Sequence, residues 1–325
     1  MDSLFISVLN MSLTGAFVII IVCLARPVLR KSPRIFLYNL WAVAGFRLTF
    51  PFSIESAFSL IPFNAQPIPP DIAMHPIPPA SGNLVASAML SGDSAIQLWI
   101  AVGSSIWLVG SALMLLYGVA SFVVLKRKLT QATNVEANIY ETETIKTPFV
   151  MGIFSPKIYL PAHLNAQERN YIVLHEQTHI RRRDHIVKFV AFLILCLHWF
   201  NPLAWLAFLL MSLDMEMSCD ERVLKELGNG AEIKKNYSMA LLSLATERRA
   251  LGGSSIAFID GDIGSRVKNV LNLKKQSYIV FGVSMALVAV LSLGFSVDRV
   301  GIGAASYDAI PETVQSDSFS ILCCD

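Results

Sequence analysis

The chain has 325 residues, of which 54% are hydrophobic and only 15% are charged, and its formal net charge is +2. Soluble domains usually carry about 25% charged residues, so this composition favours an integral membrane protein. The small net charge gives no reason to expect direct binding of nucleic acid. The five cysteines show no CxxC spacing, and no disulfide framework is predicted.

Four apolar segments are long enough to cross a bilayer, which requires roughly 20 residues. They are Leu4–Ala25, Ile35–Ile54, Ile96–Leu125 and Ser277–Val297. The first has neither a basic start nor a cleavage signal of small residues, so we expect it to be retained as a span. The fold class is therefore expected to be mainly α, in a polytopic membrane protein with four spanning helices. A soluble core of long apolar helices is the less favoured alternative.

The basic residues beside these spans predict the orientation of the chain, because they accumulate on the cytoplasmic side. They are Arg26, Arg30, Lys31 and Arg34 after the first span, and Lys126, Arg127 and Lys128 after the third. The loop 55–95 has no Lys or Arg and contains seven prolines, so it is expected to be external and irregular. Both termini are then expected outside.

These boundaries divide the chain into four parts. Residues 1–125 are expected to form a membrane domain with three spans, and residues 126–276 a cytoplasmic domain. Residues 277–297 form the final span, and residues 298–325 a short external tail.

The most specific motif is His175-Glu176-Gln177-Thr178-His179, which reads HExxH. Histidines at i and i+4 share one helix face, so both imidazoles can bind one zinc ion, and Glu176 can take a proton from water as the catalytic base. Asn165 and Glu168 predict a capping box at the start of this helix. Short strands are expected before it, within 139–145, 147–152 and 157–161.

A second acidic pair, Glu216 and Asp220, follows at i, i+4 spacing. Catalytic zinc commonly has three protein ligands and an open position, so Glu216 can complete a His₂Glu set. Asp220, one turn further on, can hold a ligand histidine from behind. A solvated acidic helix face is the alternative. Cys219 could reach the metal and His185 could assist the site, but packing is expected for the first and a surface role for the second. His198 lies in an apolar run, where a histidine is often functional, but a hydrogen-bonded packing role at the hairpin tip is expected.

A fifth apolar run, Phe189–Leu213, separates the two halves of this motif set. If the run crossed the membrane once, Glu216 would lie on the opposite side of the bilayer from His175, and the two side chains could not bind one ion. The run must therefore return to the side on which it entered.

Asn201 and Pro202 provide the turn, since Asn is a favoured N-cap and Pro a favoured first helical residue. Each arm has about 12 apolar residues, or roughly 18 Å of helix, which is too short to span. We therefore expect a helical hairpin over residues 189–213 that dips into the membrane, with Gly228 ending the second helix.

A family resemblance rests on five motifs that occur in order. They are Thr147-Pro148-Phe149-Val150-Met151-Gly152, Pro156-Lys157-Ile158-Tyr159-Leu160-Pro161, the HExxH segment, Asn201-Pro202-Leu203 and Glu216-Met217-Ser218-Cys219-Asp220-Glu221-Arg222-Val223-Leu224. This pattern resembles the membrane metallopeptidases typified by the beta-lactam sensor-transducers, the antirepressors of penicillinase and methicillin-resistance operons. The resemblance covers roughly Leu4 to Val297 and is specific from Thr147 to Leu224.

The resemblance implies a gluzincin-like cytoplasmic zinc peptidase domain in a bacterial cell-membrane protein. It implies that His175, His179 and Glu216 bind Zn²⁺ and that Glu176 is catalytic. Family members cleave themselves or a cytoplasmic repressor after an external signal. Only about 28 residues follow Val297, too few for an external penicillin-binding domain, so beta-lactam sensing by an acylated serine is not expected.

Three functions are compatible with these motifs. The favoured one is a regulatory endopeptidase that cleaves a winged-helix transcriptional repressor, or itself within the stretch Gly228–Lys275. The alternatives are a protease that degrades damaged membrane proteins, and a non-enzymatic receptor with a structural zinc site. The intact Glu176 argues against the receptor, because a structural site needs no base there. Homodimerisation is left open.

Overall fold

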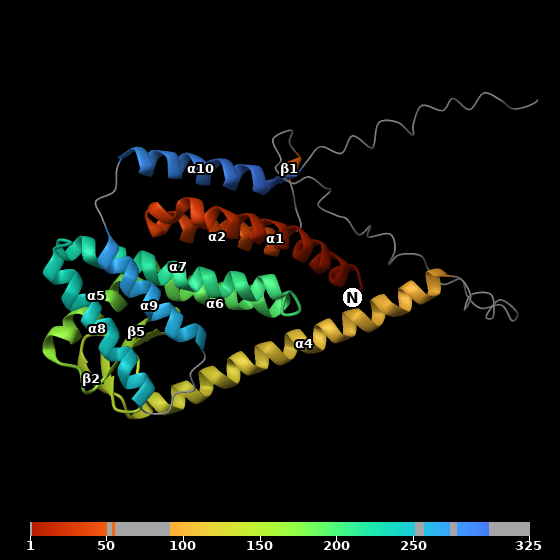
Figure 1. Cartoon of the computed structure of the whole chain (residues 1–325). Coiled ribbons are helices and arrows are strands. Elements are labelled where there is room, and N and C mark those ends of the chain that lie inside the picture. Colours follow the sequence, from red (N-terminus) through yellow and green to blue (C-terminus); the bar gives the residue numbers. More distant parts are fainter. Residues whose placement is uncertain (1, 51–53, 56–91, 251–256, 274–277, 299–325) are drawn as a thin grey trace, which may run out of the picture.

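The computed structural model describes residues 2–50, 54–55, 92–250, 257–273 and 278–298, and its architecture is mainly helical (Figure 1). The helices are α1 (Asp2–Val28), α2 (Arg34–Thr49), α4 (Gly92–Lys128), α5 (Ala166–Arg182), α6 (Asp184–Leu197), α7 (Pro202–Leu227), α8 (Ala231–Ala250), α9 (Ala257–Asn272) and α10 (Tyr278–Ser296), with 3-10 turns at Leu29–Lys31 and Leu129–Gln131. The strands are β1 (Ile54–Glu55), β2 (Thr133–Glu136), β3 (Ile139–Thr142), β4 (Phe149–Met151), β5 (Lys157–Pro161) and β6 (Val297–Asp298). Most of the Pro-rich loop predicted at 55–95 and nearly all of the predicted tail at 298–325 lie outside the described residues.

Four described helices are long and apolar enough to cross a membrane. They are Asp2–Lys31, Ile96–Gln131, Pro202–Leu227 and Tyr278–Phe295. Three of them correspond to spans predicted from the sequence. The fourth is α7, and the expectation that both arms of the hairpin are too short to span is wrong for this helix, because it continues for 26 residues to Leu227.

The predicted span Ile35–Ile54 is shorter in the structure and is not among these four. Helix α2 ends at Thr49 after 16 residues, or about 24 Å, less than the hydrocarbon core of a bilayer. Phe50 is already extended at φ −108° and ψ 116°, and Pro51 follows it. A residue before proline is disfavoured in the helical region, which explains the early end.

Helix α2 nevertheless lies inside the bundle, where it packs against α1, α7 and α10 (Figure 1). The apolar core there is contributed mainly by α1, α2 and α7 through Val18, Ile19, Val22, Leu37, Leu40, Ala44, Ala207, Met211 and Met215. A separate cluster joins α7 to α8 and α9 through Cys219, Val223, Leu224, Tyr237 and Val270. Helix α7 therefore belongs to two cores.

Buried polar contacts fix α7 to the first two helices. Arg26 of α1 donates to Asp214 at 2.8 Å, and the Trp41 indole of α2 donates to the other oxygen of this fully buried carboxylate at 2.9 Å. Seven residues further along α7, Glu221 accepts the backbone N–H of Arg34 at 2.9 Å. A carboxylate is favourable at that position because the N-terminus of α2 carries unpaired donors.

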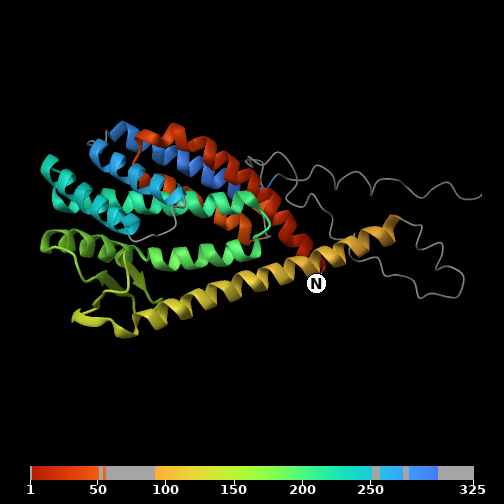
Figure 2. The same cartoon turned by 60° about the horizontal axis from the view of Figure 1, so that its bottom comes forward.

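Helices α6 and α7 are joined by a short turn and pack side by side, as a hairpin over 189–213 requires (Figures 1 and 2). Its insertion into the membrane stays a prediction. The Asn201 side chain caps α7 by accepting the N–H of Leu203 at 2.9 Å, and Pro202 occupies the first turn. Gly228 ends α7 in the left-handed conformation at φ 98°, as predicted. The arms are unequal, since α6 has 14 residues and α7 has 26.

The small sheet has the strand order β2-β3-β5-β4. Strands β3 and β5 pair in parallel, while β2 pairs with β3 and β4 with β5 in antiparallel fashion. Strands β3, β4 and β5 fall within the predicted segments, and β2 was not predicted. Ile139, Ile158, Leu160 and Ile172 form a core between the sheet and α5. Strand β4 is left at an edge of the sheet, beside α5.

Candidate metal centre

The helix that carries HExxH begins with the predicted capping box. The Asn165 side chain accepts the N–H of Glu168 at 2.8 Å, and the Glu168 carboxylate accepts the N–H of Asn165 at 3.4 Å. This cap fixes the start of α5, and hence which residues face the protein interior. His175, Glu176 and His179 are all buried on that face.

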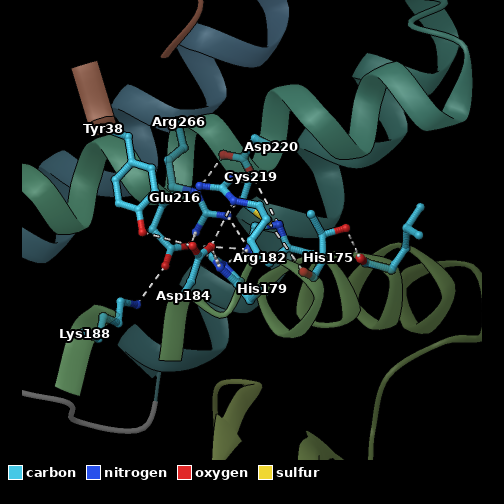
Figure 3. A network of polar contacts seen from close by, with 12 residues as sticks. Tyr38, His175, His179, Arg182, Asp184, Lys188, Glu216, Cys219, Asp220 and Arg266 are labelled. Atoms are coloured by element: carbon cyan, nitrogen blue, oxygen red, sulfur yellow. Dashed lines mark hydrogen bonds and ion pairs between the residues drawn. The ribbon is translucent and has the colours of Figure 1, made fainter. Parts of the chain in front are cut away.

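The structure brings both imidazoles and one carboxylate oxygen together. The Nε2 atoms of His175 and His179 are 3.1 Å apart, and the Oε2 atom of Glu216 lies 3.3 Å from the first and 3.4 Å from the second. A tetrahedral zinc ion with ligand bonds of 2.0–2.1 Å would separate its ligand atoms by about 3.3 Å. The three predicted ligand atoms therefore have the spacing of three corners of such a site (Figure 3).

Cys219 offers a fourth donor at the same place. A ligand atom from each of His175, His179 and Cys219 lies within 4.8 Å of the others, and the Cys219 thiol contacts the backbone carbonyl of His175 at 3.6 Å. Cys219 is fully buried one turn of α7 beyond Glu216. The donors present thus allow a His₂Glu or a His₂Cys set.

His175 is held from behind by a chain of polar side chains from three helices. Its Nδ1 lies 2.8 Å from the Tyr237 hydroxyl, which donates to Oδ1 of Asp220 at 2.7 Å. A carboxylate only accepts, so the ring donates from Nδ1 and keeps the Nε2 lone pair for a ligand. Asp220 lies behind the histidine, where the sequence predicted it. Arg266 of α9 donates two hydrogen bonds to the Asp220 carboxylate, at 2.8 and 2.9 Å.

His179 is held by a different carboxylate. Its Nδ1 donates to Oδ2 of Asp184 at 2.7 Å, and Tyr38 of α2 donates to Oδ1 of the same group at 3.1 Å. Asp184 is the first residue of α6 and is fully buried. Arg183, just before it, is in the left-handed conformation at φ 60°, which turns the chain so that Asp184 faces back onto α5.

Two cations flank the carboxylate of Glu216. Lys188 lies 3.0 Å from Oε1, and Arg266 lies 3.3 Å from Oε2.

The charged groups around the site also change the pKa values of the two histidines. Burial alone would lower the pKa of His175, but Cys219 and Glu216 raise this pKa to about 10. Burial would likewise lower the pKa of His179, whereas Glu216 and Asp184 hold it well above its usual value.

This arrangement favours positive charge between the imidazoles and Glu216. A divalent cation supplies such charge and displaces protons from its ligands as it binds. The donor set of nitrogen with carboxylate or thiolate, the spacing of its atoms and its charge balance all fit zinc.

A cavity of about 490 Å³ opens beside this cluster. Glu176 lines it next to both histidines, and the edge strand β4 contributes Phe149 and Val150. Apolar side chains from α5, α8 and α9 cover other walls, among them Ile172, Leu241, Leu244 and Ile263. The cavity is thus bordered by the Glu176 carboxyl group, a sheet edge and apolar surface.

Comparison with known proteins identifies the family. The model of the family described as BlaR1 peptidase M56 matches residues 6–270. The chain belongs to this family. It is 28% identical over 215 residues to the "Regulatory protein BlaR1" of Bacillus licheniformis, an alignment that covers 58% of this chain and 36% of the relative.

A second group of relatives agrees with the first. The "Methicillin resistance mecR1 protein" of Staphylococcus aureus is 26% identical over 166 residues, covering 46% of this chain and 28% of the relative, and the protein of the same name from Staphylococcus epidermidis matches equally. The aligned part is about a third of the length of these relatives. The comparisons confirm the resemblance inferred from the sequence. Together with the four apolar helices, they identify this M56 chain as a multi-pass membrane protein.

The motif pattern of this M56 chain does not predict the residues that support the histidines and Glu216. They are Tyr38, Asp184, Lys188, Tyr237 and Arg266. Asp184 alone has a local signal, because it directly follows the basic run that ends α5. His198 lies where a packing residue was expected, and it donates to the Leu48 carbonyl at 2.8 Å at the hairpin tip. His185 was expected to serve the surface, but it lines the cavity together with His175 and Glu176, and its ring contacts the Ile153 carbonyl at 3.4 Å.

Proposed function

We propose that this chain is a membrane-embedded zinc-dependent endopeptidase of a signalling pathway, which cleaves itself or a cytoplasmic transcriptional repressor. The observation that carries the proposal is the convergence of His175, His179 and Glu216 at 3.1–3.4 Å beside Glu176. Membership of a peptidase family supports hydrolysis, and the names of the relatives support a regulatory role.

His175, His179 and Glu216 would hold the zinc ion, with Asp220 orienting His175. Glu216 is preferred to Cys219 because its Oε2 atom is already at ligand spacing from both imidazoles. When bound, zinc would polarise the scissile carbonyl and lower the pKa of a water molecule toward neutrality.

Glu176 would act as the base that accepts a proton from the attacking water. The same carboxyl group would then deliver this proton to the amide nitrogen as the C–N bond breaks, so that an acid and an amine leave. Strand β4 borders the cavity with an unpaired edge and could bind the substrate as an added strand.

The orientation of the chain belongs to the same proposal. Basic residues follow the first span and end α4, at Lys126–Lys128, directly before the sheet. This distribution of basic residues supports the proposal that the sheet, α5 and the metal centre face the cytoplasm, where a repressor is accessible.

The test compares the full-length wild type in membranes with Glu176→Gln and His175→Ala. Bound zinc is measured together with cleavage of the chain and of a co-expressed winged-helix repressor. We expect Glu176→Gln to keep zinc but lose about 10²- to 10⁴-fold in cleavage rate. His175→Ala should lose both.

A matched pair decides the third ligand. Glu216→Gln should abolish tight zinc binding, whereas Cys219→Ser should retain it. The reverse result would assign the site to His₂Cys. If Glu176→Gln binds zinc and cleaves like the wild type, the metal is structural and the peptidase proposal is wrong.

A further inference from the structure

A membrane-domain helix takes part in the hydrogen bonding of the metal centre. The Tyr38 hydroxyl of α2 donates to Oδ1 of Asp184 at 3.1 Å, and Oδ2 of this carboxylate accepts from His179 Nδ1 at 2.7 Å. Figure 3 shows Tyr38 descending from its own helix toward Asp184, apart from the helices that carry the histidines and Glu216. One carboxylate therefore joins α2 to a candidate zinc ligand.

The position of Tyr38 is fixed on a second side. The Arg182 guanidinium carbon lies 5.1 Å from the centre of the Tyr38 ring, and Arg182 Nε lies 3.3 Å from Oδ2 of Asp184. The Tyr38 ring thus contacts the Arg182 guanidinium, and the Tyr38 hydroxyl contacts the Asp184 carboxylate with which Arg182 also pairs. A tyrosine that merely filled space would need neither contact.

We propose that Tyr38 is a positioning residue of the metal centre, which acts through Asp184 on the orientation of the His179 ring. The inference rests on the proposed function, since it concerns a zinc ligand of that site. Asp184 is fully buried, so both of its oxygens require donors. With Tyr38 on one oxygen and His179 on the other, the carboxylate cannot turn without losing a bond, and it fixes the imidazole plane.

Helix α2 also contacts α7, the helix that carries Glu216. Trp41 donates to Asp214 and the Arg34 backbone donates to Glu221, and both acceptors lie on α7 close to Glu216. Helix α2 therefore touches His179 through Asp184 and supports the helix of Glu216. A shift of α2 relative to α5 and α7 would change the spacing of the ligand atoms. The membrane bundle can in this way set the affinity for zinc.

The experiment uses the full chain purified in detergent. Zinc affinity is measured by competition with a chelator for the wild type, Tyr38→Phe and Tyr278→Phe. Tyr278 is an exposed tyrosine at the start of α10, so its variant is a matched control. We expect Tyr38→Phe to bind zinc about 3- to 10-fold more weakly, a smaller loss than the 10- to 100-fold expected when Asp184 itself is replaced by Ala. Tyr278→Phe should match the wild type.

The route is tested by combining the variants. If Tyr38 acts through Asp184, then Tyr38→Phe should cause no further loss in an Asp184→Ala background. Equal losses in both backgrounds would overturn the proposal. The visible spectrum of the Co²⁺-loaded protein is a second measurement that does not need Asp184→Ala to fold. It should differ between Tyr38→Phe and the wild type, because it reports the geometry of the ligands.

The outcomes separate the two proposals. A wild type that binds no zinc contradicts the proposed function. A wild type that binds zinc, with Tyr38→Phe equal to Tyr278→Phe in affinity and spectrum, contradicts this inference alone.

Discussion

The two histidines of the metal centre lie one helical turn apart, yet different parts of the molecule support them. His175 is backed by Asp220, Tyr237 and Arg266, from α7, α8 and α9. His179 is backed by Asp184 at the start of α6 and by a tyrosine of α2. His175 thus depends on α7 and the two helices that follow it, whereas His179 depends on the start of α6 and on α2 of the membrane bundle.

The two supports also differ in charge. On the His175 side, one guanidinium contacts two carboxylates, those of Asp220 and Glu216, at 2.8–3.3 Å. On the His179 side, Arg182 meets Asp184 through Nε alone, and within the described residues its two Nη atoms have no hydrogen-bond partner. The support of His175 therefore contains more ion pairs than the support of His179. We expect that removing the cation from the first support lowers the free energy of unfolding more than removing the cation from the second.

The largest effect is expected from Arg266→Met. This change leaves the buried carboxylates of Asp220 and Glu216 without their shared cation, and breaking such a pair costs about 3–5 kcal/mol. We expect a lower midpoint of thermal unfolding in detergent and about 10- to 100-fold weaker zinc binding. Lys268→Met removes the same charge from an exposed position two residues away and should change stability by about 0.5 kcal/mol or less. Equal behaviour of the two variants would contradict the ionic role of Arg266.

A smaller effect is expected from Tyr237→Phe, which removes the hydroxyl between His175 and Asp220. Zinc affinity should fall by about 3- to 10-fold, as for Tyr38→Phe. Because the two tyrosines act on different imidazoles through different carboxylates, the losses in the double variant should multiply. A double variant no weaker than either single one would show that both histidines share one support.

The smallest effect is expected from Arg183→Gly at the junction of α5 and α6. Arg183 has φ 60°, a conformation that costs a side-chain-bearing residue about 1 kcal/mol and costs glycine almost nothing. The unfolding midpoint should therefore rise slightly or stay unchanged, with zinc affinity preserved. A clear loss of zinc affinity would show that the Arg183 side chain itself helps to place Asp184.

The sequence predicted the parts of the site that local chemistry determines. The capping box at Asn165, the spacing of His175 and His179 and the Asn201-Pro202 turn each follow from residues within a few positions of one another. Glu216 could be predicted as the third ligand because its spacing to Asp220 matches the motif. Since one ion needs all its ligands on one side of a membrane, the chain between His179 and Glu216 was then expected to form a hairpin.

Tyr38, Tyr237 and Arg266 could not be predicted in this way. Tyr38 lies 146 residues from Asp184, Tyr237 lies 62 residues from His175, and Arg266 lies 46 residues from Asp220. Each is on a separate helix whose packing no local pattern fixes. The length of α2 was missed because its apolar run continues past Phe50, although the proline after Phe50 was a signal for the end. Strand β2 is exposed along its whole length and so lacks an apolar pattern.

Helix α4 has 37 residues and hence a length of about 55 Å, against a hydrocarbon core of about 30 Å. Figures 1 and 2 show it leaving the bundle and leading at its other end directly into the sheet. Two of its glycines lie close to α6 and the turn that follows α6: a methyl group on Gly118 would overlap the Phe192 ring of α6, and one on Gly110 would overlap the Trp199 ring of the turn. Helix α4 is therefore longer than the bilayer is thick, and it contacts α6 closely. Tilting its far end would displace the sheet and α6 together, and with them both the substrate edge and the carboxylate behind His179.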